Sequence, residues 1–140
     1  GHSGSGNFRC SPNMSASGAG PPGVRLVQYV VVRSDLTQKL AWPLGAVIAQ
    51  ACHAATAAIH VHYDDPDTRR YLADLDSMHK VVLAAPDEAA LCGLADALTR
   101  AGVAHKLWVE QPEDIPTCLA LKPCPKETAQ PHVRKFKLFK

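Results

Sequence analysis

The feature that most constrains the fold is a run of apolar, mostly β-branched residues at positions 24–32, interrupted only by Arg25 and Gln28. Such residues favour strands, and a run without strict alternation is typical of a central strand covered on both faces. The run is followed by Arg33, Ser34 and Asp35, and then by an alanine-rich stretch that we expect to be helical from Pro43 to about residue 62. The pattern therefore predicts the strand-to-helix unit of an α/β protein.

Further strands are expected at residues 80–84, 105–109 and 117–122, with a short helix near residues 66–75 and a longer one at 86–101. The loop at 110–116 is too short for a crossover helix, so the last two strands should be antiparallel neighbours. The alternation predicts an α/β fold, a three-layer α/β/α sandwich with a small four-stranded mixed sheet.

Composition sets the broad limits of the protein. The chain has 140 residues and a net charge of +2. Residues 1–23 are poor in large apolar side chains, so we expect a disordered N-terminal extension there and a folded domain at 24–140. We expect no membrane span, because no apolar run approaches the roughly 18 residues that a span needs.

Cysteine usage bears on location. The five cysteines form no Cys-x-x-Cys pair and are odd in number, which indicates free thiols in a reducing compartment. The expected location is the cytoplasm. A mitochondrial targeting segment is the alternative, because residues 1–23 contain no acidic side chain.

Three polar residues suggest a site at the strand-to-helix junction: Asp35, Gln50 and His53. Open α/β sheets usually bind ligands at such junctions, and an Asp that orients a His, which activates water, is a recurrent device for ester cleavage. Helical spacing places Gln50 and His53 on a polar stripe open to solvent or substrate. The alternatives are that Asp35 only caps the loop and that His53 only bonds a neighbouring side chain.

No metal site or cofactor is expected. His60 and His62, followed by two aspartates, resemble a ligand cluster, but histidines at a helix C-terminus are favoured by the helix dipole without any metal. Cys52 lies beside His53, yet adjacent helix positions diverge, so we expect a buried small thiol rather than a nucleophile.

Two motifs carry a resemblance to a known family. Residues 33–36 read Arg-Ser-Asp-Leu, and residues 49–55 read Ala-Gln-Ala-Cys-His-Ala-Ala. From Val27 onward the chain resembles the type 2 peptidyl-tRNA hydrolases, in particular the animal peptidyl-tRNA hydrolase domain-containing branch. The resemblance implies cofactor-free hydrolysis of the ester between a peptide and the 3′ ribose of tRNA.

The resemblance also implies roles for individual residues. His53, Asp35 and Glu110 would share the acid–base work beside Gln50, with Glu110 in place of the family's aspartate and Thr117 in place of its threonine. The family's lysine position is Ala46. Two functions therefore stay open: a peptidyl-tRNA hydrolase, or a catalytically weak or inactive relative that binds RNA or a protein partner. A different cofactor-free esterase or amidase is a third.

The C-terminal region is the expected contact for peptidyl-tRNA or another RNA. From residue 115 onward bases outnumber acids, and Lys and Arg supply most sequence-independent affinity for phosphate. The predicted contacts are Lys122, Lys126, Arg134 and Lys135. An ordinary solvated terminus is the alternative, and a homodimer is left open.

Overall fold

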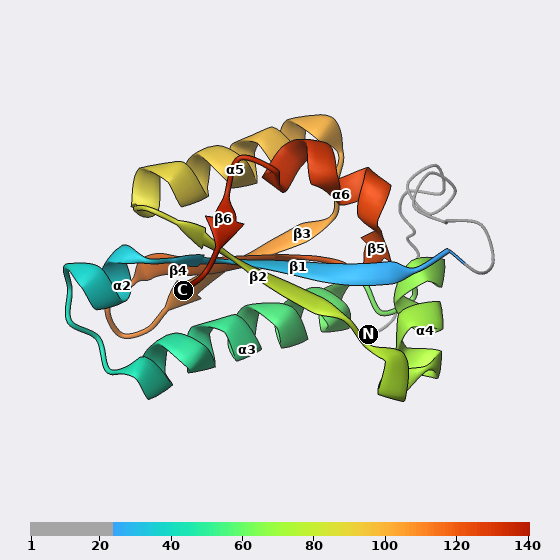
Figure 1. Cartoon of the computed structure of the whole chain (residues 1–140), viewed down its shortest axis with the longest axis horizontal. Coiled ribbons are helices and arrows are strands. Elements are labelled where there is room, and N and C mark those ends of the chain that lie inside the picture. The colour runs from blue at the N-terminus through green and yellow to red at the C-terminus, as the bar shows by residue number, and fades with distance from the viewer. Residues whose placement is uncertain (1–23) are drawn as a thin grey trace.

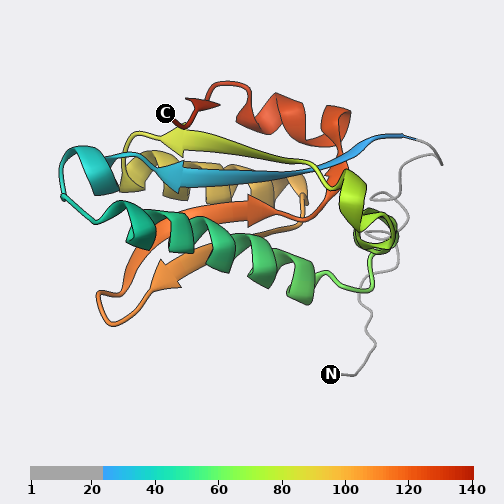
Figure 2. The same cartoon turned by 60° about the horizontal axis from the view of Figure 1, so that its bottom comes forward.

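The computed structural model describes residues 24–140, in which helices cover both faces of a twisted sheet (Figure 1). Helix α3 lies on one face, and α5 and α6 lie on the other (Figure 2). The three-layer α/β/α prediction is confirmed; the prediction for residues 1–23 lies outside the described residues. The strands are β1 Leu26–Arg33, β2 Lys80–Ala85, β3 His105–Glu110, β4 Ile115–Leu121, β5 Cys124–Pro125 and β6 Lys137–Leu138. The helices are α2 Asp35–Gln38, α3 Leu44–Val61, α4 Pro66–Ala73, α5 Glu88–Ala101, α6 Lys126–Val133 and the 3₁₀ turn η2 Leu75–Ser77.

The sheet is mixed and has the order β3-β4-β1-β2-β6, with β5 paired to β1 beside this path. Strands β1 and β2 are parallel, whereas β1–β4, β3–β4 and β2–β6 are antiparallel. The predicted antiparallel pairing of the last two long strands is therefore confirmed. The predicted four strands correspond to β1–β4, but the sheet has six strands, because β5 and β6 add two residues each. Strands that short carry no periodic pattern.

Strand β1 divides the core into two parts. Alternate side chains of a strand point to opposite faces, so Tyr29 and Val31 pack toward α5 and α6, while Val30 and Val32 pack toward α3. All four are buried. Burying each of the valines contributes about 1.5–3 kcal/mol, which explains why this strand contains almost no polar residue.

Helix α3 begins directly after Trp42-Pro43, as predicted, and it packs on the sheet through small side chains. Ala54 and Ala58 are fully buried and allow the helix to lie close to β1 and β4. The expectation that no segment is long and apolar enough to cross a membrane was wrong for α3, whose 18 residues meet that test by length and composition alone. A helix packed on a core sheet passes the same test.

Lys122 ties the end of β4 to helix α4. Its ammonium group is 3.0 Å from an Asp65 carboxylate oxygen and 3.3 Å from an Asp67 carboxylate oxygen. The Asp65 side chain also caps α4 by accepting the backbone N–H of Asp67. Because Lys122 is buried and its charge is already paired, we remove it from the predicted tRNA contacts.

We predict that Lys122→Ala lowers the free energy of unfolding by about 3 kcal/mol, because it leaves the Asp65 carboxylate without its cationic partner and the buried Asp67 carboxylate with Arg70 but without Lys122. The matched control is Arg69→Ala, which breaks an exposed ion pair to Asp64 and should change stability by less than about 0.5 kcal/mol. Urea unfolding followed by circular dichroism measures both. Equal losses in the two variants would contradict the structural role of Lys122.

Candidate active site

A β-bulge in β4 determines where the Thr117 side chain lies. In the pairing with β3, Trp108 lies opposite Cys118 and the next residue, Val109, lies opposite Pro116, so Thr117 is the extra residue. Strict alternation from Leu119 and Leu121 would turn Thr117 toward α5 and α6. The bulge instead lets its hydroxyl reach α3, and bulges of this kind often re-aim a side chain next to an active site.

Gln50 of α3 is the hydrogen-bond partner of the Thr117 hydroxyl. The hydroxyl donates to Gln50 Oε1 over 2.7 Å, and Gln50 Nε2 donates to the Ala46 carbonyl over 3.2 Å. Both Gln50 and Thr117 are buried. The predicted solvent-facing stripe is therefore wrong for Gln50, which points into the sheet with Val47 and Ala54, whereas His53 is exposed. Hydrogen bonding to both ends of the amide holds Gln50 in one orientation.

Trp108 connects the two other predicted site residues of this face. Its ring stacks on the His53 ring with centroids 4.7 Å apart and planes 23° apart. Its indole N–H donates to Glu110 Oε1 over 3.0 Å. His53 and Glu110 are thus brought to the same place by one aromatic side chain, on the strand that neighbours β4.

The environment keeps Glu110 ionised. The Trp108 hydrogen bond lowers the pKa of Glu110 below its usual value, and the Gln50 amide and the nearby charge of His53 act in the same direction. Burial raises the pKa of Glu110, but by less than the Trp108 hydrogen bond lowers it. A carboxylate is therefore available beside an accessible imidazole.

Asp35 does not orient His53. Both of its carboxylate oxygens accept hydrogen bonds from Arg33, at 3.0 Å from Nε and at 2.8 Å from the terminal nitrogen. This hydrogen bonding raises the pKa of Arg33. The third nitrogen of Arg33 donates to the Pro116 carbonyl over 2.9 Å, immediately before the bulge at Thr117. Asp35 thus supports the site through Arg33 and β4.

The remaining sequence predictions concern thiols and metals. Cys52 is exposed, not buried as expected, because it lies on the side of α3 away from the buried Gln50 and Ala54. Among residues 24–140 no group of three or more His, Cys, Asp or Glu side chains has the arrangement of a metal site.

Of the predicted phosphate contacts, Lys126, Arg134 and Lys135 are exposed, but they belong to α6 and the turn after it, on the opposite face of the sheet from His53. Sequence reasoning missed Lys106, which is exposed and shares the α3 face of β3 with Trp108 and Glu110. The signal was present as the alternation of positions 106, 108 and 110.

Comparison with known proteins assigns the family. The profile described as peptidyl-tRNA hydrolase PTH2 matches residues 26–139. The chain belongs to this family. It is 54% identical over 134 residues to the Homo sapiens protein named "Putative peptidyl-tRNA hydrolase PTRHD1", covering 95% of this chain and 94% of the relative. The Mus musculus protein of the same name is 53% identical over 128 residues, covering 91% and 90%. The resemblance predicted from the motifs is confirmed.

In this member of the PTH2 family, Trp108→Phe should raise the pKa of Glu110 toward the ordinary carboxyl value of 4.5, because the stack on His53 stays while the indole N–H donor is lost. NMR titration of the Glu110 side chain measures the change. Trp42→Phe is the control and should leave the titration of Glu110 unaltered. An unchanged pKa of Glu110 in Trp108→Phe would show that the indole hydrogen bond is not what lowers it.

Proposed function

We propose that this protein hydrolyses the ester bond between a peptide and the 3′ ribose of tRNA, on the α3 face of the sheet. The observation that supports this proposal is the continuous arrangement of Thr117, Gln50, Glu110 and His53 in a chain that belongs to the PTH2 family. The names of the two mammalian relatives describe the same hydrolase activity and support this assignment.

The geometry suggests a role in ester hydrolysis for each residue of the site. His53 is exposed and can take a proton from the attacking water, while the nearby Glu110 carboxylate stabilises the imidazolium that results. Trp108 fixes the plane of the imidazole. Thr117 and the Ala46 carbonyl hold the Gln50 amide, which also hydrogen-bonds Glu110 and helps to keep that carboxylate charged. The imidazolium returns its proton to the departing 3′ oxygen, so hydrolysis is complete without a further acid.

The site lacks a fixed cation at the start of α3. Ala46 lies one turn before Gln50 and is half-buried. Its methyl group carries no positive charge that could stabilise the oxyanion formed during ester hydrolysis. A single well-placed donor at such an oxyanion is worth about 100- to 1000-fold in rate. We therefore infer that hydrolysis by this chain is slow.

Ala46→Lys should raise the rate of peptidyl-tRNA cleavage by up to about 100-fold, because Lys is nearly as good a helix former as Ala and would project beside Gln50. Release of labelled peptide from peptidyl-tRNA measures the rate. Ile48→Lys is the control: it adds the same charge at an exposed position of α3 on another face. Adding His53→Ala to Ala46→Lys should remove the gain.

A natural chain that already cleaves as fast as a family member bearing the lysine would show that Ala46 marks no deficit. If Ala46→Lys stays inactive and tRNA still binds, the better account is the alternative function, an inactive relative that binds RNA.

We propose that tRNA approaches the site along β3, where Lys106 is an exposed cation two and four residues before Trp108 and Glu110. A tRNA that also contacted Lys126, Arg134 and Lys135 would have to pass around an edge of the sheet, because these residues lie on the other face. The two groups of cations can be separated by mutation.

Lys106→Gln should weaken tRNA binding and reduce the slope of log affinity against log salt by about 1, because one phosphate contact is lost. Lys135→Gln is the control of equal charge on the opposite face and should leave both quantities unchanged. Fluorescence anisotropy of labelled tRNA at several salt concentrations measures them. The reverse pattern would mean that tRNA binds the α6 face instead.

A further inference from the structure

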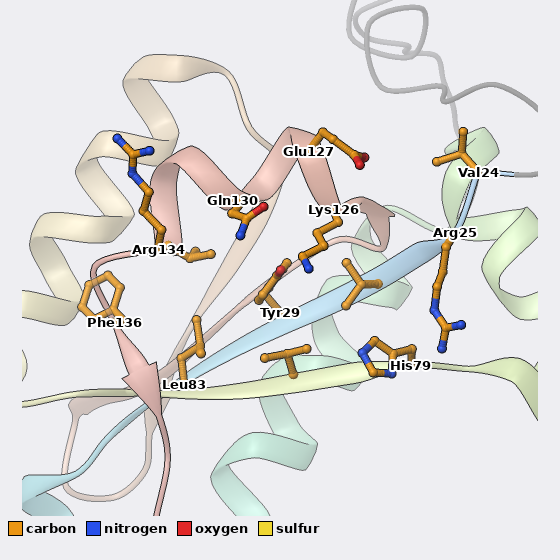
Figure 3. A pocket seen from close by; sticks show the side chains of 13 residues that line it. Val24, Arg25, Tyr29, His79, Leu83, Lys126, Glu127, Gln130, Arg134 and Phe136 are labelled. Carbon is orange, nitrogen blue, oxygen red and sulfur yellow. The ribbon is translucent and has the colours of Figure 1, made fainter.

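A cavity of about 500 Å³ lies on the face of the sheet opposite His53 and Glu110, between α6 and strands β1 and β2 (Figure 3). This volume is in the range of small-molecule sites. Its apolar lining comes from both strands and from the α6 region, and consists of Val24, Val27, Val81, Leu83, Val133 and Phe136. The cavity therefore offers an apolar floor that the proposed hydrolase site does not use.

Positive charge surrounds this floor. Arg25 lies at the β1 end, while Lys126 and Arg134 lie along α6, and Glu127 is the only acidic side chain in the lining (Figure 3). Three cations against one carboxylate favour a ligand that carries negative charge. Lys126 and Arg134 are two of the residues that the sequence analysis assigned to tRNA.

Tyr29 supplies an independent sign of a ligand. Its side chain lines the cavity and is only 6% exposed, yet its hydroxyl has no hydrogen-bond partner within residues 24–140. The hydroxyl oxygen is not itself fully enclosed: it opens into the cavity, where a ligand oxygen can accept a hydrogen bond from it. Burial raises the pKa of Tyr29, which keeps the hydroxyl protonated and able to donate.

We propose that this cavity binds an amphiphilic anion, a molecule with an extended apolar body and a carboxylate or phosphate head. The head accepts from the Tyr29 hydroxyl and pairs with Lys126 and Arg134, and the body lies on Val27, Val81 and Leu83. The charged groups and the apolar floor are both used by such a ligand, which is what distinguishes it from other occupants.

An RNA backbone fits the cavity less well, because phosphates would meet the cations while polar sugars faced an apolar floor. Residues 1–23 of the chain itself are a poorer match, since they contain Arg9 and no acidic residue, so their charge has the same sign as that of the cavity. An external amphiphile is therefore the occupant that the lining favours.

Isothermal titration calorimetry of the full chain tests the proposal with three probes that share one apolar chain: decanoate, decyl phosphate and decyltrimethylammonium. We expect the two anions to bind at a single site and the cation not to bind. Tighter binding of decanoate would identify the natural head group as a carboxylate, and tighter binding of decyl phosphate would identify a phosphate. Equal binding of the cationic probe would overturn the proposal.

Four variants locate the site. Arg134→Gln and Lys126→Gln should each weaken binding of the preferred anion about tenfold, because each removes a charge-assisted contact. Tyr29→Phe should weaken it several-fold without loss of stability, since the hydroxyl has no partner to lose. Lys135→Gln is the control: this cation is adjacent to Arg134 in sequence but does not line the cavity, and binding should be unchanged.

Three further results would overturn the proposal. The first is an equal loss of anion binding in Lys135→Gln and Arg134→Gln, which would indicate non-specific attraction to a basic surface. The second is undiminished binding in Tyr29→Phe, Lys126→Gln and Arg134→Gln together. The third is tRNA that displaces the anion and is itself weakened by Arg134→Gln, which would assign the cavity to RNA. None of these measurements requires the protein to be catalytically active.

Discussion

The candidate site depends on the hydrogen bonds of the buried Arg33 guanidinium. A buried guanidinium is costly unless its donors are paired, and this one is paired on every side: twice with Asp35, once with the Pro116 carbonyl, and more distantly, at 3.5 Å, with the exposed Glu88. It therefore joins the end of β1 to the first residue of α2, the start of β4 and the beginning of α5. The bulge at Thr117, the Gln50 amide and Glu110 follow in turn from the position of β4.

The division of the molecule into two faces follows from the alternation of β1. Gln28 turns toward α3, where its amide donates to the carbonyls of Ala55 and Leu121. Tyr29 turns the other way, into the cavity beneath α6. Neighbouring residues of one strand therefore face two separate layers, and a ligand in the cavity would not compete with a substrate at His53.

Much of the architecture could be predicted because it is encoded by local patterns. The β-branched run gave β1, the alanine-rich stretch after Pro43 gave α3, and the loop of 110–116 was short enough to require an antiparallel pair. The site was harder to predict. Gln50 looked like part of a polar stripe, because the sequence does not reveal that a bulge brings a threonine to meet it. Lys122 looked like a phosphate ligand, because its carboxylate partners are more than fifty residues away in the chain. The Arg33–Asp35 pair joins the last residue of β1 to the first residue of α2, so it depends on how the chain turns at Ser34, which a strand pattern does not predict.

The bulge in β4 has a consequence for comparing or redesigning such proteins. The Thr117 hydroxyl meets Gln50 because β4 contains one residue more than its partner strand needs. Deleting a single residue from the turn side of this strand would restore regular pairing with β3. The Thr117 hydroxyl would then face α5 and α6, although every side chain of the site would still be present. The number of residues in β4 therefore determines the geometry of the site as much as their identity does, and an alignment that shifts a gap by one position would misplace the hydroxyl that holds Gln50.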